Sequence, residues 1–357
     1  MAVTQVLHIL WSTRMGGIST LVRNLCVAQL SAGESGACVY SAKFDLKGSE
    51  EFRQQFIPLT NGKFKRGSDL RPLGDSRLHK LIQEHDIIHF HAFHPMLFRI
   101  ASRSGKKIVY TEHGNFGLGR TWDLGERISG WLKSRMVNRH ASAITFNSTF
   151  TRDTYLRLYG TPRCEGHVIP NGISATPFIE NKSSETFIIA CAGRLAAVKR
   201  FDRVIDAFRI ARLSDAKLII MGDGPELHAL REQAVQSGLG EHIEFRPAGN
   251  TSQLFSSADV CIVSSQGEAF GLVALEAYQQ GKKVIAFEDG GGICELVKQE
   301  DANSLVKHVE GLASLLQHLQ ANRSMLNDTD AIRRRISLAE SYSIQGMASQ
   351  FQSVYTA

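Results

Sequence analysis

Two glutamates eight positions apart, Glu268 and Glu276, enclose the segment AFGLVAL. This pattern predicts that the first carboxylate lies in a loop. The second is expected in the following helix, one to two turns after an apolar start. Carboxylates accept hydrogen bonds from hydroxyl groups. The pair therefore predicts a site that grips a ligand rich in hydroxyls.

The residues between the two glutamates predict a place for a phosphate. Gly271 has no side chain, so its backbone can come close to a ligand. The amides of Phe270, Gly271 and Leu272 are expected to be unpaired donors at a helix N-terminus, which suits an anion. Sugar hydroxyls at one end, a phosphate in the middle and a ribose at the other end describe a nucleotide sugar.

Two cations follow an apolar run earlier in the same half of the chain. Arg194 comes directly after the run, and Lys199 stands just before a helical pattern. A departing diphosphate needs fixed cations of this kind, because they neutralise charge as it develops and replace a metal. The other interpretation is that both are solvated surface residues. The placement after a strand favours the functional interpretation.

Glycines follow two further apolar runs. Gly222 opens the turn GDGPE, which either faces a base or phosphate or precedes a helix capped near Asp223. Gly16 and Gly17 follow the first apolar run, where their amides are expected near a phosphate, unless this is an ordinary turn. Neither half begins with GxGxxG, which weakens a nicotinamide interpretation, and no P-loop pattern is present.

Histidines gather at two predicted strand ends. His89 and His91 alternate along one strand and so lie on the same face, with His94 just beyond. Such spacing can hold a metal, but the sequence fixes no carboxylate or cysteine nearby, so we predict a polar wall or core packing and no metal. His113 follows the next strand, where it either donates to a sugar hydroxyl or is a capped loop residue.

Short apolar runs alternate with helical patterns in two series. The predicted strands are 6–10, 37–40, 86–91, 107–111, 142–147 and 168–170, then 187–192, 217–221, 243–245, 259–264 and 283–287. The predicted helices include 20–30, 203–212, 225–237 and 270–280. This alternation predicts parallel sheets covered on both faces, in two doubly wound α/β domains. Ligands bind such sheets beyond the carboxyl ends of the strands, where the residues above are found.

The length of 357 residues suits two domains. The polar segment 173–185 is the predicted linker, with a boundary near 176–184. The last segment is predicted to form an amphipathic helix, which carries Ile344, Met347, Phe351 and Val354 on one face.

Composition narrows the class of protein. The apolar content of 43% excludes disorder, and no apolar run approaches the roughly 20 residues of a membrane-spanning helix. The N-terminus lacks a basic region and a cleavage site, and the six cysteines are scattered, so we expect a cytoplasmic protein. The net charge is +6, yet no nucleic-acid-binding pattern is present, and we predict no nucleic acid partner.

Basic groups in the first half suggest another partner. They occupy 63–66 and 127–139, and Trp131, Leu132 and Met136 stand beside the second group. Such a segment could lie on an anionic membrane face, peripheral to the bilayer. The alternative is a packed basic helix.

Together these segments resemble glycosyltransferase family 4, which has the GT-B fold. The matching segments cover nearly the whole chain: MGG at 15–17, the strand ends at 89–91 and 112–114, VIPNGI at 168–173, AGRL to Lys199, MGDGPE at 221–226, and 264–286 around the two glutamates. The resemblance implies two facing Rossmann-like domains with an interdomain cleft. It implies an N-terminal acceptor-binding domain, 1–178, and a nucleotide-sugar-binding domain, 179–340. The C-terminal helix, 341–357, would cross back to the first domain.

The resemblance also implies roles for single residues. Arg194 and Lys199 would bind the donor diphosphate, Glu268 would face the transferred sugar, and His113 would contact that sugar near the reacting carbon. Glu276 would hold the ribose. The other donor-binding residues would be Gly16, Gly17, Gly222, Gly271 and Leu272. The family is retaining, takes an activated sugar nucleotide (a UDP-sugar is favoured here) and generally needs neither a cofactor nor a catalytic metal.

The chain departs from the family after Glu295, where a glycine-rich stretch is usual. Here the sequence has no glycine until Gly311, so the donor-side wall is expected to differ. No carboxylate is clearly placed to attack the anomeric carbon, so we expect front-face transfer, catalysed by positioning and electrostatics.

The acceptor is expected to be a lipid-linked saccharide in bacterial surface polysaccharide or glycolipid assembly. Two alternatives stay open. One is a sugar-nucleotide epimerase or phosphorylase of the same architecture, although no lysine is an obvious cofactor anchor for a phosphorylase. The other is a non-catalytic, sugar-nucleotide-binding subunit.

Overall fold

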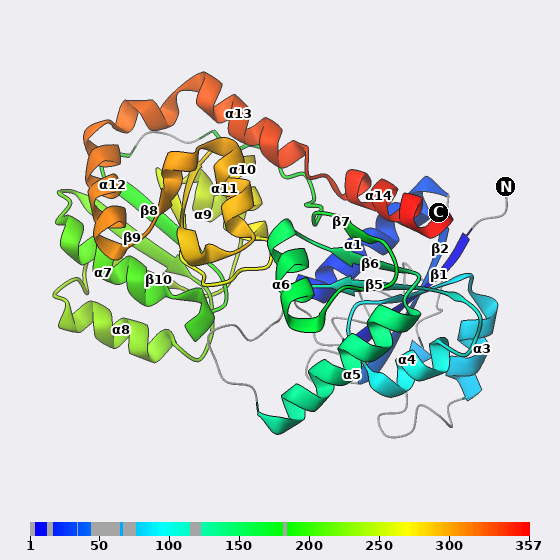
Figure 1. The fold of residues 1–357 in the computed structure, drawn as a ribbon. Coiled ribbons are helices and arrows are strands. Elements are labelled where there is room, and N and C mark those ends of the chain that lie inside the picture. Colours follow the sequence, from blue (N-terminus) through cyan, green and yellow to red (C-terminus); the bar gives the residue numbers. More distant parts are fainter. Residues whose placement is uncertain are drawn as a thin grey trace. The chain divides into compact units, whose positions relative to one another are not determined.

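The computed structural model describes residues 4–12, 17–33, 35–43, 65–66, 76–114, 123–180 and 184–357. The chain forms two compact units: Met1–Gly172 with Ile344–Ala357, and Ile173–Ser343. Each unit is built on its own parallel sheet with helices packed on both faces (Figure 1). This is the predicted doubly wound α/β architecture.

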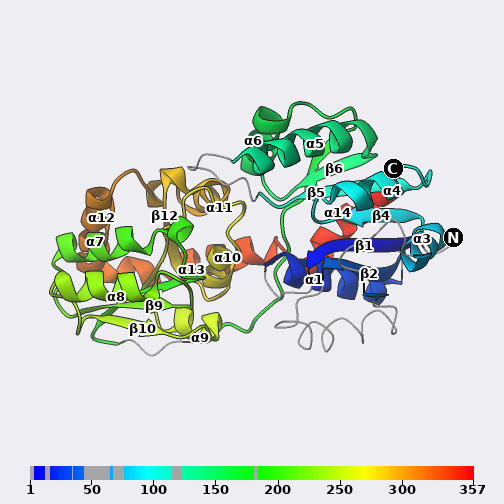
Figure 2. The same cartoon turned by 90° about the horizontal axis from the view of Figure 1, so that it is seen from below.

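The first unit has a seven-stranded sheet of order β3-β2-β1-β4-β5-β6-β7. Figure 2 shows β6, β5, β4, β1 and β2 as successive strands of this sheet. Its strands are β1 (Thr4–Ser12), β2 (Ser35–Lys43), β3 (Lys65–Arg66), β4 (Ile87–Phe90), β5 (Lys107–Glu112), β6 (Ala143–Phe146) and β7 (Gly166–Val168). Its helices are α1 (Gly17–Ala32), α3 (Ser76–Glu84), α4 (Pro95–Ala101), α5 (Leu124–His140), α6 (Thr149–Tyr159) and α14 (Ile344–Thr356).

The two faces of this sheet bury different helices. Helices α3 to α6 contribute to one core cluster, whereas α1 and α14 contribute to the other. Met347, Phe351 and Val354 of α14 are buried in that second cluster, and Ile344 packs against it. The predicted apolar face of the last helix is therefore confirmed, and this helix belongs to the first unit, although 171 residues of the second unit precede it in the chain.

The second unit has a six-stranded sheet of order β10-β9-β8-β11-β12-β13. Its strands are β8 (Phe187–Ala192), β9 (Ala216–Met221), β10 (Ile243–Arg246), β11 (Val260–Val263), β12 (Lys283–Phe287) and β13 (Leu305–Val306). Its helices are α7 (Phe201–Ala211), α8 (Leu227–Gln236), α9 (Thr251–Ser256), α10 (Leu272–Gln279), α11 (Ile293–Glu300), α12 (Val309–Ala321) and α13 (Thr329–Glu340). Helices α7, α8 and α12 pack on one face, and α9, α10 and α11 on the other.

The strand order reverses once in each sheet. The reversal lies between β1 and β4 in the first unit and between β8 and β11 in the second. Loops that leave the carboxyl ends of two such strands diverge to opposite faces and open a crevice, the usual ligand position in this architecture.

The units divide between Gly172 and Ile173, six residues before the predicted end of the first domain. Two side chains at the end of α10 hold the segment predicted as a linker. The Thr176 hydroxyl donates to the Gln279 carboxamide oxygen at 2.8 Å, and the Ile179 amide donates to that of Gln280 at 3.0 Å. This part of the segment is thus packed onto the second unit.

Candidate functional site

In the second unit, the loop after β8 is fastened to the loop after β9. The Leu195 amide donates to the Asp223 carbonyl at 2.9 Å, and the Glu226 amide donates to the Leu195 carbonyl at 3.0 Å. A Cβ on Gly222 would lie 1.9 Å from the Gly193 carbonyl oxygen, so the two backbones meet where no side chain fits. The role that the structure shows for Gly222 is to support the loop that carries Arg194.

Of the two interpretations of this turn, the one that places a helix cap near Asp223 is wrong. Helix α8 begins after Glu226 and has no side-chain cap. The Asp223 carboxylate instead accepts a hydrogen bond from the Ala248 amide at 3.0 Å, which ties the turn to the segment after β10.

Lys199 and Glu268 form an ion pair that joins the loops after β8 and β11, the two strands at the reversal. The backbones of these loops are tied as well. The Ser264 hydroxyl donates to the Lys199 carbonyl at 2.7 Å, and the Gln266 amide donates to the Val198 carbonyl at 2.9 Å. The Lys199 side chain is 25% exposed and that of Glu268 22%, so both side chains are partly open to solvent.

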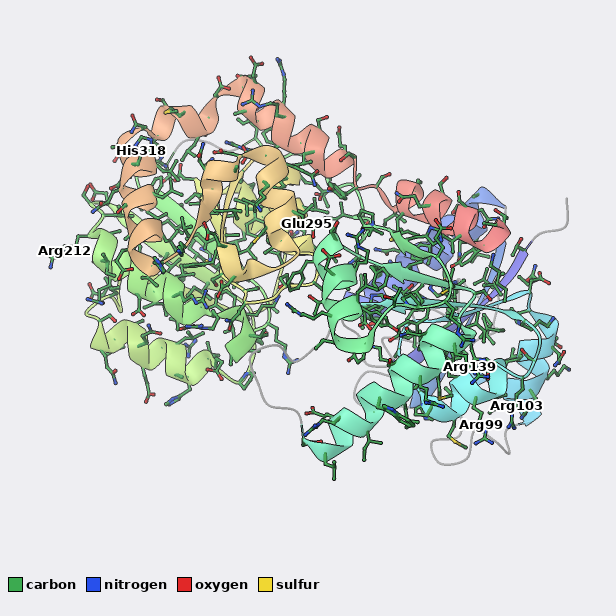
Figure 3. The ribbon with its side chains drawn as sticks, in the orientation of Figure 1. Arg99, Arg103, Arg139, Arg212, Glu295 and His318 are labelled. Carbon is green, nitrogen blue, oxygen red and sulfur yellow. The ribbon has the colours of Figure 1, made fainter. Side chains whose placement is uncertain are left out.

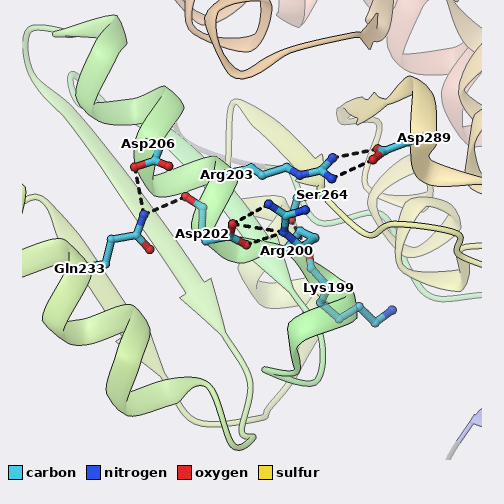
Figure 4. A network of polar contacts seen from close by, with 8 residues as sticks. All are labelled: Lys199, Arg200, Asp202, Arg203, Asp206, Gln233, Ser264 and Asp289. Carbon is cyan, nitrogen blue, oxygen red and sulfur yellow. Dashed lines mark hydrogen bonds and ion pairs between the residues drawn. The ribbon is translucent and has the colours of Figure 1, made fainter. Parts of the chain in front are cut away.

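The loop after β12 holds Glu268 from its other side. The Glu268 amide donates to the Gly290 carbonyl, and the Gly292 amide donates to the Glu268 carbonyl, both at 2.7 Å. Arg203 anchors this loop by binding both oxygens of Asp289, at 2.8 and 2.7 Å (Figure 4). Sequence reasoning missed Arg203 and Asp289, and the only signal was the glycine run that follows Asp289.

Figure 4 shows the Lys199 side chain extending away from the neighbouring pair of Arg200 and Asp202. Arg200 binds Asp202 through three hydrogen bonds of 2.9–3.1 Å. Two adjacent cations therefore differ in role: Arg200 is engaged by a carboxylate at the start of α7, whereas Lys199 is directed at Glu268.

Arg194 is exposed, and its side chain has no hydrogen-bond or ion-pair partner among the described residues. Its loop is nevertheless fixed, because Leu195 is fully buried and bonded on both sides. A guanidinium on a fixed backbone with an uncommitted head can receive an anionic ligand.

The start of α10 requires a glycine. Gly271 has a φ of 99°, and a Cβ there would lie 2.4 Å from the Cδ1 atom of Ile293. The helix begins at Leu272, two residues later than Phe270, and has no side-chain cap. Uncapped amides at a helix start are donors for an anion.

Glu276 lies in the middle of α10 and is partly buried. Burial raises the pKa of its carboxyl group, and a hydrogen bond with the Thr251 side chain at the start of α9 partly opposes that rise. The two glutamates therefore have different environments: Glu268 has a cation, whereas Glu276 has a hydroxyl group.

In the first unit, the histidines gather at the reversal of the other sheet. His8 of β1 is paired in register with His89 of β4. His91 follows β4, and its Nε2 atom lies 3.0 Å from the Nδ1 atom of His8. His113 follows β5, and its Nε2 atom lies 3.3 Å from the Nδ1 atom of His91. The predicted common face of His89 and His91 is confirmed, since their rings are 4.0 Å apart.

Burial lowers the pKa of all four imidazoles, to about 4 for His8 and His113 and well below 6.5 for His89 and His91. They are therefore neutral at pH 7. His94 stands apart, because it caps α4 by accepting from the Leu97 amide.

One nitrogen from each of His8, His89 and His91 lies within 4.8 Å of the others, a spacing that could hold a metal ion. However, both nitrogens of His89 already contact hydroxyl groups, of Tyr355 at 2.7 Å and Thr111 at 2.6 Å. The group contains no carboxylate to offset a buried divalent charge. The contacts favour a hydrogen-bonded polar cluster over a metal centre.

Only one glycine of the predicted pair after β1 lies among the described residues. Gly16 lies outside the described residues. Gly17 is the exposed first residue of α1, and a Cβ there would meet no atom within 4 Å. Packing among the described residues therefore does not require a glycine at 17.

The basic segment of α5 has an exposed apolar stripe. Leu124, Ile128 and Trp131 follow one another at helical spacing and are 73%, 51% and 59% exposed. Two predicted surface residues lie elsewhere: Lys133 is paired with the buried Glu112, and Met136 packs against the core.

Exposed arginines lie on the same helix and on or near its neighbour α4. They are Arg127, Arg135 and Arg139 on α5, with Arg99 on α4 and Arg103 just beyond it. Figure 3 labels Arg99, Arg103 and Arg139. No helix in the described part of the chain is long and apolar enough to span a membrane.

Two family models match the chain in succession. The model described as Glycosyltransferase Family 4 matches residues 15–176, and the model described as Glycosyl transferases group 1 matches residues 173–334. The two matches meet close to the division between the two units.

Several known proteins are similar in sequence. A GDP-mannose-dependent alpha-(1-6)-phosphatidylinositol monomannoside mannosyltransferase of Mycolicibacterium smegmatis is 28% identical over 286 residues, 71% of this chain and 72% of that protein. The enzyme of the same name from Mycobacterium tuberculosis is 27% identical over 62% of this chain and 63% of that protein. An N-acetyl-alpha-D-glucosaminyl L-malate synthase of Bacillus anthracis is 31% identical over 44% of this chain and 42% of that protein.

Solved structures share the fold over the whole chain. HepE of Anabaena in complex with UDP has a TM-score of 0.81 at 19% identity, covering 99% of this chain and 100% of that one. WaaG, a glycosyltransferase involved in lipopolysaccharide biosynthesis, has a TM-score of 0.71 at 14% identity, covering 99% of this chain and 100% of that one. These likenesses identify the fold as GT-B.

Proposed function

Because this chain belongs to the glycosyltransferases of family 4, we propose that it is a retaining enzyme that moves a sugar from a nucleotide-sugar donor to an acceptor hydroxyl. The observation that carries the proposal is the pairing of Lys199 with Glu268 at the strand reversal of the second unit. A cation and a carboxylate are thereby placed together, and hydrogen bonds to neighbouring loops hold the backbone on which they stand.

In this proposal the second unit holds the donor. Lys199 and Arg194 bind the diphosphate, and the amides at Gly271 and Leu272 receive one of its phosphates. Glu268 accepts hydrogen bonds from the sugar, and Glu276 accepts them from the ribose. Gly222 acts through the loop of Arg194 that it supports.

The proposed reaction breaks the bond between the anomeric carbon and the diphosphate oxygen. Lys199 and Arg194 stabilise the negative charge that the leaving oxygen gains, so we propose that no metal is needed. The departing diphosphate accepts the proton of the acceptor hydroxyl, whose oxygen forms the new bond on the same face. His113 of the first unit contacts the sugar during this exchange.

We favour a UDP-sugar as the donor, since HepE was solved with UDP and with UDP-glucose. The mycobacterial relatives are described as GDP-mannose-dependent, so GDP-mannose is the competing donor. The proposed acceptor is a lipid-linked saccharide, as in glycolipid or surface polysaccharide assembly. The arginine-flanked stripe of α5 supports it, because such a surface suits an anionic membrane.

The test begins with thermal shifts against UDP-glucose, GDP-mannose and ADP-glucose, because a ligand of the native state raises its melting temperature. The preferred nucleotide and its 2′-deoxy form are then titrated into wild type and Glu276→Gln. If Glu276 holds the ribose, losing the 2′-hydroxyl weakens binding to wild type about tenfold but changes binding to the variant far less. Equal losses would remove Glu276 from the ribose site, and no shift with any nucleotide sugar would refute the donor proposal.

A further inference from the structure

A series of side-chain hydrogen bonds runs from His113 into the core of the first unit. His113 Nε2 lies 3.3 Å from His91 Nδ1, and His91 Nε2 lies 3.0 Å from His8 Nδ1. His8 Nε2 lies 3.0 Å from the carboxamide oxygen of Gln29 on α1. Three imidazoles are thus joined end to end, and a carboxamide closes the series.

The C-terminal helix contacts the other end of that carboxamide. Gln29 Nε2 donates to the Tyr355 hydroxyl oxygen at 3.5 Å, and this hydroxyl lies 2.7 Å from His89 Nδ1. The Gln29 amide group therefore faces α14, and its oxygen faces His8. All these side chains except His113 are buried, so water does not compete with the contacts.

The direction of every bond in the series then follows from Gln29. Its oxygen can only accept, so the single proton of neutral His8 is on Nε2. His8 Nδ1 must accept, so His91 donates from Nε2. His91 Nδ1 must accept in turn, so His113 donates from Nε2. The lowered pKa values of these imidazoles support one proton on each ring.

The other ring nitrogen of His113, Nδ1, carries no proton and keeps its lone pair. Nδ1 of His113 has no hydrogen-bond partner among the described residues, and the residue is partly exposed. The sequence suggested His113 as a donor to a sugar hydroxyl. The single N–H of its ring is instead donated to His91, so Nδ1 can only accept a hydrogen bond.

We propose that Gln29, His8 and His91 hold His113 as its Nε2–H tautomer, so that Nδ1 accepts a hydrogen bond from a hydroxyl of the transferred sugar. Gln29 and Tyr355 are then positioning residues for a group far along the chain. This inference rests on the proposed sugar contact of His113. It predicts that the enzyme requires a hydroxyl that can donate, and rejects a donor in which fluorine replaces it.

The tautomer is measured without any ligand. Long-range nitrogen–proton NMR spectra of the protein labelled with ¹⁵N-histidine distinguish a protonated from an unprotonated Nδ1. We expect His113 of the wild type to be unprotonated at Nδ1 at pH 7. In Gln29→Met the acceptor is gone, and we expect a mixture of tautomers at His113. A protonated Nδ1 in the wild type, or an unchanged spectrum in Gln29→Met, would overturn the proposal.

Kinetics then separate positioning from folding. Gln29→Met should raise KM for the preferred nucleotide sugar about tenfold, the loss of one hydrogen bond, while its affinity for the free nucleoside diphosphate stays unchanged. Tyr355→Phe, which keeps the ring, should act in the same direction but less strongly. Tyr342→Phe is the matched control, because that hydroxyl donates to Gln299 in the second unit.

Fluorinated donors identify the hydroxyl concerned. Monofluoro forms of UDP-glucose or GDP-mannose, whichever binds, are compared in wild type and His113→Ala. Fluorination at one position should weaken binding to the wild type and weaken binding to the variant much less. If the effects of fluorination and of His113→Ala simply add at every position, the acceptor role is contradicted. If the NMR result holds but no nucleotide sugar binds, the tautomer assignment stands and the proposed function fails.

Discussion

Lys199 and Glu268 neutralise each other across 69 positions of sequence. Both side chains remain about one quarter exposed, so the pair is a modest source of stability. Its larger consequence concerns ligands. A diphosphate that binds Lys199 competes with Glu268, and it thereby frees the carboxylate to accept hydrogen bonds from a sugar. The two proposed roles are therefore coupled through one contact.

Glu268→Gln tests this coupling. The substitution removes the charge that competes for Lys199 but keeps a hydrogen-bonding group. We expect the free nucleoside diphosphate to bind several-fold more tightly, whereas turnover of the nucleotide sugar falls. Calorimetric titration and initial rates check the two effects, with Glu310→Gln on α12 as an exposed control. Weaker diphosphate binding in the variant would show that the carboxylate and the ligand do not compete.

Gly271→Ala should destabilise the second unit for two separable reasons. The left-handed backbone at φ 99° costs a non-glycine residue about 1–2 kcal/mol, and the contact with Ile293 adds about 1–3 kcal/mol. Gly238→Ala is the control, since φ there is 71° and a Cβ would meet nothing within 4 Å. Urea unfolding should show a larger loss for Gly271→Ala, and equal losses would mean that Ile293 yields without cost.

The buried histidines should make the protein sensitive to mild acid. Their pKa values in the folded state lie below the unfolded value of about 6.5, so between about pH 6.5 and 4 the unfolded chain binds protons that the native state does not bind. The contribution of these histidines to the free energy of unfolding is therefore fully present above about pH 6.5. It falls as the pH falls, by up to about 1.4 kcal/mol per pH unit for each histidine.

Two carboxyl groups act differently in the same titration. Glu276 has a raised pKa and so opposes the loss of stability, whereas Glu244, with a pKa of about 2, adds to it only below about pH 4.3. Urea midpoints measured from pH 7.5 to 4.5 should fall steadily. A midpoint that stays level or rises over this range would contradict the neutral, buried state of the histidines.

The stripe on α5 predicts binding to anionic vesicles. Trp131→Glu should abolish co-sedimentation with vesicles that contain phosphatidylglycerol, and salt should weaken the binding of the wild type. Val235→Glu is the matched control, because Val235 is 70% exposed on α8 of the second unit. If the wild type does not sediment, or if the control loses binding equally, α5 is not the membrane contact.

Much of the fold could be predicted because the strands are buried on both faces and are therefore almost continuously apolar. The prediction depends on such apolar runs, and it missed β3 and β13 because they have two residues each and carry none. The exit of the chain from the first unit was placed too late, because Thr176 and Ile179 look like linker residues until Gln279 and Gln280 bind them.

The candidate site was predictable where a residue follows a strand, as Lys199 and Glu268 do. Their contact was not, because it depends on which strands become neighbours: β8 and β11 are adjacent in the sheet but separated by two strands in sequence. The partner of Lys133 was hidden likewise, since only the folded chain brings Glu112 to it. His8 gave no signal at all, because a histidine within an apolar strand shows its partners only in three dimensions.

The most direct test of the account is the turnover of Lys199→Ala with its preferred nucleotide sugar, beside Lys307→Ala as an exposed control. If Lys199 stabilises the departing diphosphate, its loss lowers kcat about 10²–10³-fold, as for other preorganised charge stabilisers, while the control is unaffected. Near-normal turnover of Lys199→Ala would contradict the central claim.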